Sequence, residues 1–309
     1  MGRSPKNRGR VIGHPTLWSP EELPQTAEKF PEKNFQSLRF PLWTQNKARL
    51  IEEYLRLFQY VTRHGNYIDG FAAPQEAEHL EMWAAKRVLE MTPKWFRNFW
   101  LCDIDPKGVA KLAALKSEHE TPQRQVFVLS GDFNKSVANV LKSEKITEKT
   151  ATFALLDQRT FECDWETVRR LSLCKKENKI EIFYFFATGW IDRSIAAVRA
   201  PVTVDRVEKW WGRDDWRNLQ GMDSTRRAKL ISSRFEDELG YGKATPYPIH
   251  SELRGGRTMY HMIHATDHPE ASPLMIRAYR KVSGRHEIDP ADAQADFDEL
   301  WQRLTEDRD

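Results

Sequence analysis

The stretch that most constrains this chain is residues 66–74, which read NYIDGFAAP. An apolar pair ends in Asp69 and Gly70, small residues and a proline follow, and a helical pattern lies on either side. This pattern is typical of the first strand of a doubly wound α/β sheet as the chain enters its ligand-binding turn. We therefore expect a nucleotide-like ligand beyond the carboxyl end of this strand.

The rest of the chain alternates short apolar segments with helical patterns. Further strands are predicted at 96–103, 125–129, 152–156 and 180–186, and a hairpin at 247–253 and 258–265 around the turn sequence RGGR. The segment 180–186, IEIFYFF, is apolar throughout, as expected for a strand buried on both faces. These elements indicate an α/β fold with a mostly parallel sheet, right-handed crossovers and a closing antiparallel hairpin.

Changes in composition along the chain suggest five segments. We expect a basic, proline-rich arm at 1–41, a core at 42–189, a helical insertion at 190–245, a closing hairpin and helix at 246–283, and an acidic tail at 284–309. Within the core, a long helix is predicted after Thr44 and a second one at about 78–91.

Overall composition narrows the class of protein. The chain has 309 residues, of which 40% are hydrophobic, and a net charge of +3, which together indicate a soluble protein with a sizeable core. We expect no membrane helix, because no run approaches the roughly 20 apolar residues required. Cys102, Cys163 and Cys174 lie in or beside apolar segments, which favours a reducing, cytoplasmic environment. The mildly basic balance is compatible with a nucleic-acid partner without requiring one.

Several local motifs share their order and spacing with a known family. They are WTQNK at 43–47, YIDGFA at 67–72, GDFN at 131–134 and YHMIHATDHP at 260–269. Together they resemble the three-Cys-motif partner proteins (TcmP), over roughly residues 40–283. Members look like Rossmann-type methyltransferases and are named for a companion protein with a radical-SAM-like, three-cysteine motif. The resemblance therefore implies a Rossmann-like methyltransferase fold, S-adenosylmethionine as the cofactor, and that companion as a partner.

The resemblance also implies roles for residues at the predicted strand ends. The turn Asp69, Gly70, Phe71 and Ala72 would approach the cofactor, Asp103 would accept hydrogen bonds from its ribose, and Asp132 and Phe133 would contact its adenine. Two helix-capping alternatives remain open. Asp105 suits the N-cap of a helix beginning at Pro106, and Asp132 suits the N-cap of the helix that follows it.

Asp157 follows the fourth predicted strand, where methyltransferases place substrate-handling residues. Family members read Asp-Pro-Phe-Gly there, which is similar to the motif that holds an exocyclic amine in nucleic-acid amino-methyltransferases. This chain reads DQRT at 157–160, and it lacks the glycines of the family turn at Ala73 and Gln75. Of the family motif at this point, only the acid is retained. Asp157 is the predicted catalytic residue of an enzyme acting on a base nitrogen, because it could accept a hydrogen bond from the reacting amine. The alternative is a catalytically degenerate fold, a pseudoenzyme that serves as a binding or assembly module.

The predicted insertion interleaves tryptophans with basic residues, a composition that suits stacked bases and phosphates. The nucleic-acid-binding residues predicted there are Arg206, Lys209, Arg213 and Arg217. The competing interpretation is that its tryptophans are core residues. A metal site is not predicted, because His261 and His264 would point to opposite sides of one strand and no nearby cysteine or acid completes a set.

Overall fold

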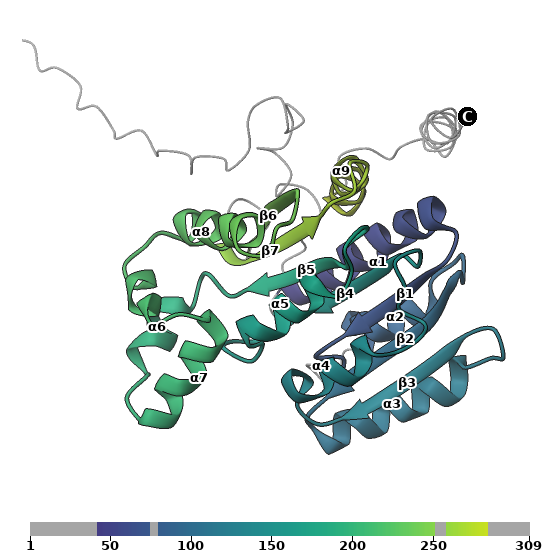
Figure 1. The fold of residues 1–309 in the computed structure, drawn as a ribbon, viewed down its shortest axis with the longest axis horizontal. Coiled ribbons are helices and arrows are strands. Elements are labelled where there is room, and N and C mark those ends of the chain that lie inside the picture. Colours follow the sequence, from purple (N-terminus) through teal and green to yellow (C-terminus); the bar gives the residue numbers. More distant parts are fainter. Residues whose placement is uncertain (1–41, 75–79, 251–257, 284–309) are drawn as a thin grey trace, which may run out of the picture.

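The structure, a computed structural model, describes residues 42–74, 80–250 and 258–283. Its centre is a seven-stranded sheet in the order β3-β2-β1-β4-β5-β7-β6 (Figure 1). The strands are β1 (Gly65–Asp69), β2 (Phe96–Asp103), β3 (Gln125–Ser130), β4 (Thr152–Leu156), β5 (Glu181–Phe186), β6 (Lys243–His250) and β7 (Thr258–Thr266). The first five pair in parallel, and β7 runs antiparallel between β5 and β6. This arrangement confirms the predicted Rossmann-like methyltransferase fold class.

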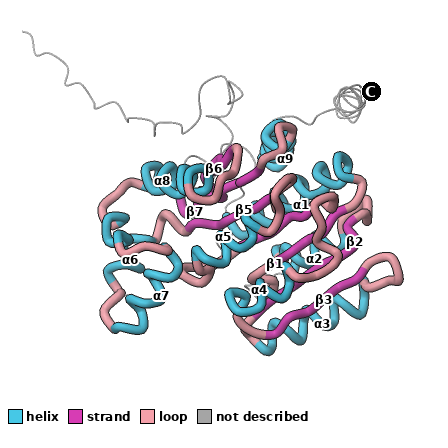
Figure 2. Tube along the Cα trace, viewed as in Figure 1, coloured by secondary structure: helices cyan, strands magenta, loops and turns pink. Residues whose placement is uncertain are grey.

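Helices connect the strands, and Figure 2 shows them on both sides of the sheet. They are α1 (Leu42–Thr62), α2 (Ala84–Glu90), α3 (Pro106–His119), α4 (Phe133–Leu141), α5 (Trp165–Leu173), α6 (Ile191–Ala196), α7 (Pro201–Trp211), α8 (Ser224–Asp237) and α9 (Ala271–Ser283), with 3-10 turns η2 (Leu80–Met82) and η3 (Asp215–Leu219). In the part of the chain that the structure describes, no helix is long and apolar enough to cross a membrane.

Two predicted elements differ from those observed. The helix expected at 78–91 is shorter, because Trp83 has an extended backbone that separates η2 from α2. The strand expected at 247–253 begins earlier, at Lys243, and is described as far as His250, while 251–253 lie outside the described residues. Its prolines, Pro246 and Pro248, are tolerated because β6 is the edge strand, where a missing N–H leaves no ladder bond broken. The predicted turn, arm and acidic tail lie outside the described residues.

The sheet separates two apolar cores. Along each strand, neighbouring side chains alternate between the faces, so that Phe153 and Leu155 enter one core while Ala154 and Leu156 enter the other. The first core lies under α1, α2, α3 and α9, and the second lies under α4, α5, α7 and α8. Two-sided burial explains why β5 is apolar at almost every position.

Between β5 and β6 the chain forms the helices α6, α7 and α8. Figure 1 shows α6 and α7 on the side toward which the arrowhead of β5 points. They are joined to the loop after β4, because Trp210 packs on Phe161 with ring centroids 4.6 Å apart and Arg206 Nε donates to Phe161 O over 2.9 Å. The helices therefore stand beside the edge of the sheet where the parallel strands end.

Candidate functional site

Parallel strands bring four acidic residues to one edge of the sheet. Asp69 and Asp103 are the last residues of β1 and β2, while Asp132 and Asp157 follow β3 and β4 within two residues. Because β1 lies between β2 and β4, the acids of these three strands are neighbours at their carboxyl ends. Ligands of open α/β sheets bind in the crevice outside this edge.

Asp69 is 1% exposed and holds the turn after β1 in place. Its carboxylate accepts a hydrogen bond from the hydroxyl of Tyr67 over 2.9 Å and from the backbone N–H of Phe71 over 3.1 Å. Burial raises the pKa of Asp69 to about 7, and the nearby charges of Asp157 and Asp103 act in the same direction. Near neutral pH, this carboxyl therefore exists in both protonated and ionised forms.

The turn itself is packed closely against its surroundings. A Cβ at Gly70 would lie 2.6 Å from Cδ1 of Phe133, so only glycine fits without movement of that ring. Ala72 is tied to β2 by its N–H, which donates to Cys102 O over 2.8 Å, and its carbonyl accepts from Trp83 Nε1 over 2.5 Å. Phe133 is 2% exposed, and in this arrangement it supports the turn from within the second core.

Asp103 lies half-buried between the turn after β1 and the start of α3. Its Oδ2 accepts from the backbone N–H of Ala73 and its Oδ1 accepts from that of Asp105, both over 2.9 Å. Each carboxylate oxygen has a second lone pair, so Asp103 retains capacity for two further donors such as ribose hydroxyls. Ala73 is pressed against α3, since a Cβ at Gly108 would lie 2.4 Å from the Cβ of Ala73.

The residue after Asp103 was not singled out from the sequence. Ile104 is 71% exposed, which is unusual for a large apolar side chain, and it lies directly beyond the end of β2. An exposed apolar side chain beside a carboxylate is suited to a ligand with a flat apolar face and hydroxyl groups, such as a nucleoside. The sequence feature that could have identified Ile104 as a site residue is an isoleucine directly after the aspartate that ends an apolar strand.

Both helix-capping alternatives are confirmed. The carboxylate of Asp105 accepts from the backbone N–H groups of Lys107 and Gly108 at the start of α3. Asp132 accepts from the N–H of Asn134 over 2.9 Å at the start of α4. Asp132 is only half-buried, so the cap leaves part of its carboxylate accessible to another group.

Asp157 is held by a lysine that the sequence did not identify as a site residue. Lys47 Nζ donates to Asp157 Oδ1 over 2.5 Å, and the two side chains are 3% and 10% exposed. The ammonium also lies over the rings of Phe185 and Tyr260, 4.7 Å and 5.6 Å from their centroids. The predicted catalytic acid therefore already has a cationic partner, which α1 brings across the edge of the sheet.

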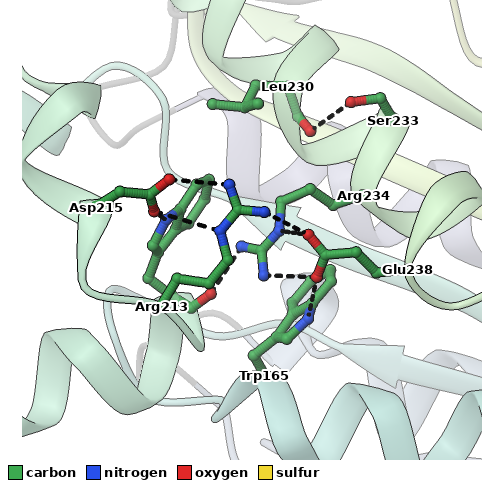
Figure 3. A network of polar contacts seen from close by, with 8 residues as sticks. Trp165, Arg213, Asp215, Leu230, Ser233, Arg234 and Glu238 are labelled. Carbon is green, nitrogen blue, oxygen red and sulfur yellow. Dashed lines mark hydrogen bonds and ion pairs between the residues drawn. The ribbon is translucent and has the colours of Figure 1, made fainter.

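Three of the four tryptophans of the insertion are core residues, as the packing interpretation predicted, and the fourth, Trp190, is half-buried. Trp210, Trp211 and Trp216 are each 2% exposed. Figure 3 shows how the polar groups around Arg234 and Glu238 are paired. Arg234 donates to the carbonyl of Trp211 over 2.7 Å and binds Glu238, which also accepts from Trp165 Nε1 over 3.0 Å.

The four basic residues predicted to bind nucleic acid are exposed on α7, on η3 and on the segment between them, and their partners differ. Lys209 pairs with Asp205 over 2.6 Å, one helical turn away. Arg213 bridges Asp215 and Glu238 over 2.9 and 2.8 Å, as Figure 3 shows. Arg206 bonds the loop after β4, and the guanidinium of Arg217 lies 4.1 Å from the ring centroid of Trp216.

The two histidines of β7 enter different environments. His261 Nδ1 lies 2.9 Å from the hydroxyl of Thr188, and His264 Nε2 lies 3.0 Å from Glu181 Oε1. Within the described ranges, no group of three or more histidine, cysteine, aspartate or glutamate side chains is arranged to hold a metal ion.

No protein-family model matches the chain, and no curated protein sequence matches it. Solved structures that are similar include M. jannaschii TYW2 in complex with AdoMet, with a TM-score of 0.33, 8% identity, and coverage of 70% of this chain and 74% of that chain. They also include wild-type Trm5b from Pyrococcus abyssi, with a TM-score of 0.34, 13% identity, and coverage of 70% and 48%. At these scores no functional argument follows from the similarity.

Proposed function

We propose that the chain is an S-adenosylmethionine-dependent methyltransferase-like protein that binds this cofactor at the carboxyl edge of β1 and β2. The observation that carries the proposal is the adjacent pair Asp103 and Ile104. The carboxylate of Asp103 has unused acceptor positions for ribose hydroxyls, and the exposed side chain of Ile104 offers an apolar surface for the adenine. The residues at this end of the crevice fit the nucleoside half of the cofactor.

The turn after β1 would border the other half of the cofactor, which supplies a methyl group bound to a positively charged sulfur. Gly70 and Ala72 keep the backbone close to the strand end, and Asp69 fixes the turn through Phe71 N–H and Tyr67. Because the pKa of Asp69 is raised to about 7 by burial, its negative charge is only partly developed at neutral pH. We assign Asp69 to positioning the turn.

For the methyl acceptor, we propose a nitrogen of a nucleic-acid base, with Asp157 as the residue that accepts a hydrogen bond from it. Lys47 donates a hydrogen bond to Oδ1 of Asp157, which leaves Oδ2 to accept a hydrogen bond from the amine that receives the methyl group. The exposed basic residues of α7 and η3 support this substrate class, because Arg206 and Trp210 join α7 to the loop that follows Asp157. Phosphates bound there would lie on the acceptor side of the crevice.

A second candidate function is favoured by the same Lys47–Asp157 contact. An acid whose charge is compensated by a buried lysine is a weaker acceptor for a substrate amine than an unpaired one. Together with the altered motif at 157–160, this supports a protein that retains cofactor binding and serves an assembly. In that case the partner we propose is the radical-SAM-like, three-cysteine companion that the TcmP resemblance implies.

Transfer of a labelled methyl group distinguishes the two functions. The purified chain is incubated with methyl-tritiated S-adenosylmethionine and with RNA, single-stranded DNA or duplex DNA, and label in the nucleic acid is measured. If the chain is an enzyme, we expect label in the nucleic acid with the wild type and none with Asp157→Asn. Cofactor binding without label in any nucleic acid would favour the assembly module, and absence of both would contradict the cofactor proposal.

A further inference from the structure

A cavity of about 680 Å³ lies at the opposite edge of the sheet from the carboxyl ends of the parallel strands. It is bordered by the last turn of α1, the starts of β4 and β5, and the segment that joins β7 to α9. Thr152, the first residue of β4, lines this cavity, whereas Asp157 follows the last residue of the same strand. At about 3.3 Å per residue, the two sites are separated by about 16 Å.

A buried carboxylate forms the polar floor of this cavity. Glu181 accepts a hydrogen bond from the hydroxyl of Tyr54 and lies 3.0 Å from Nε2 of His264, both through Oε1, while Oε2 accepts from Thr266 over 3.2 Å. The Glu181 side chain is 7% exposed, yet it contributes to the cavity wall. Oε2 has a second lone pair, so this floor can accept one further hydrogen bond from a ligand.

Basic residues lie at the mouth of the cavity, and its lining mixes apolar side chains with polar ones, which include the exposed Asp267. Lys149 and Arg63 are exposed there, with His64 beside them. Lys149 forms no ion pair or hydrogen bond with any residue of the described ranges, so its ammonium is available to an anion. The walls between mouth and floor include Phe58 and Leu274, which are 7% and 4% exposed.

We propose that this cavity binds a phosphorylated nucleoside whose base carries an exocyclic amino group. The phosphate would be held by Lys149 at the mouth, and the flat base would lie against the apolar part of the lining. The amino group would donate to Glu181, as carboxylates do with the exocyclic amine of cytosine. The cavity volume lies within the usual range of small-molecule sites. This inference does not depend on the proposed methyltransferase-like function.

Cytidine and uridine monophosphates provide a matched pair of probes. They differ at one edge of the ring: cytosine presents an amino group beside an unprotonated N3, and uracil presents a carbonyl beside an N3–H. Only cytosine therefore offers a donor at the exocyclic position that would face Glu181. By calorimetry, we expect cytidine monophosphate to bind the full chain with a Kd below about 1 mM and uridine monophosphate to bind at least roughly tenfold more weakly. Equal binding of both nucleotides, or no heat from either at millimolar concentration, would overturn the proposal.

Charge reversals test the location. Lys149→Glu should weaken cytidine monophosphate binding at least roughly tenfold without altering the melting temperature, because its side chain is exposed and has no described partner. Lys229→Glu is the matched control, since Lys229 is an exposed lysine of α8 that does not line the cavity. Asp103→Ala should leave this binding unchanged. If Asp103→Ala abolishes it, or if both lysine variants weaken it equally, the nucleotide binds elsewhere and the proposed site is wrong.

Discussion

Lys47 and Asp157, separated by 110 positions in the sequence, form a buried ion pair with 2.5 Å between Nζ and Oδ1. The pair joins the second turn of α1 to the carboxyl end of β4, so a helix that precedes the first strand contributes directly to the edge of the sheet where the parallel strands end. Any substrate amine that approaches Asp157 must share this carboxylate with a lysine already in place. The contact thus links the stability of the fold to the accessibility of the predicted catalytic acid.

Lys47→Met tests how much the buried ion pair contributes to the stability of the fold. Removal of one partner leaves the carboxylate of Asp157 buried and unpaired, which we expect to lower the free energy of unfolding by about 3–5 kcal/mol. Urea denaturation at neutral pH measures the effect. In the double variant Lys47→Met/Asp157→Leu both charges are removed, and the loss should be smaller than in Lys47→Met alone. A single-variant loss below about 1 kcal/mol would mean that the pair is not buried in solution.

Asp69→Asn should change how stability depends on pH. The pKa of Asp69 is raised by burial to about 7 from an ordinary value of 3.8, so between these values the folded state retains a proton that the unfolded state has lost. Stability from this group is therefore present below about pH 4 and is lost as pH rises to about 7, by on the order of 4 kcal/mol. Denaturation curves at about pH 5, 6 and 7 should show that the free energy of unfolding declines less steeply with rising pH in Asp69→Asn than in the wild type. Identical slopes in both proteins would contradict the assigned pKa.

Gly70→Ala tests the close packing of the turn after β1. The added Cβ would lie 2.6 Å from Cδ1 of Phe133, and we expect the resulting strain to cost about 1–3 kcal/mol of unfolding free energy. Phe133→Leu in the same chain should recover part of that loss, because it removes the ring atoms that are contacted. If the double variant loses as much as the sum of the two single variants, Gly70 and Phe133 do not interact as described.

Much of this architecture could be predicted from local sequence patterns. The run IEIFYFF marked β5 because both faces of that strand are covered, and Asp105 and Asp132 marked the starts of α3 and α4 because capping involves residues only a few positions apart. The acids at the strand ends were also identifiable, since parallel strands in this order must end at one edge.

The partners of those acids were not predictable in the same way. The Lys47–Asp157 contact depends on how α1 crosses the sheet, and no local periodicity encodes a contact over 110 residues. Trp83 was placed inside a helix because its neighbours have helical character, yet its indole bonds the carbonyl of Ala72 and its backbone is extended. Glu181 was read as part of a buried strand, and only the assembled sheet shows that it forms the floor of a cavity.

The exposed basic residues of the insertion predict salt-dependent binding of nucleic acid. Lys209→Glu/Arg217→Glu is the preferred variant, because Lys209 pairs only with the exposed Asp205 among described residues, whereas Arg213 bridges two acids of the fold. We expect the double reversal to weaken binding of single-stranded RNA and to reduce the slope of log K against log salt by about 2. Fluorescence anisotropy over a salt series measures this, with Lys229→Glu as control. A wild type that ignores RNA and DNA at low salt would refute this substrate class.

We propose that Asp103 and Ile104 bind the nucleoside half of S-adenosylmethionine. Calorimetry with its demethylated product, S-adenosylhomocysteine, tests this claim without requiring catalysis. We expect binding in the micromolar range, about −8 kcal/mol, and a loss of about 1–3 kcal/mol in Asp103→Ala, because the ribose hydroxyls lose their acceptor. Asp214→Ala, which removes an exposed acid of the insertion, should bind as the wild type does. No heat at millimolar ligand, or equal affinity in Asp103→Ala and wild type, would contradict the account.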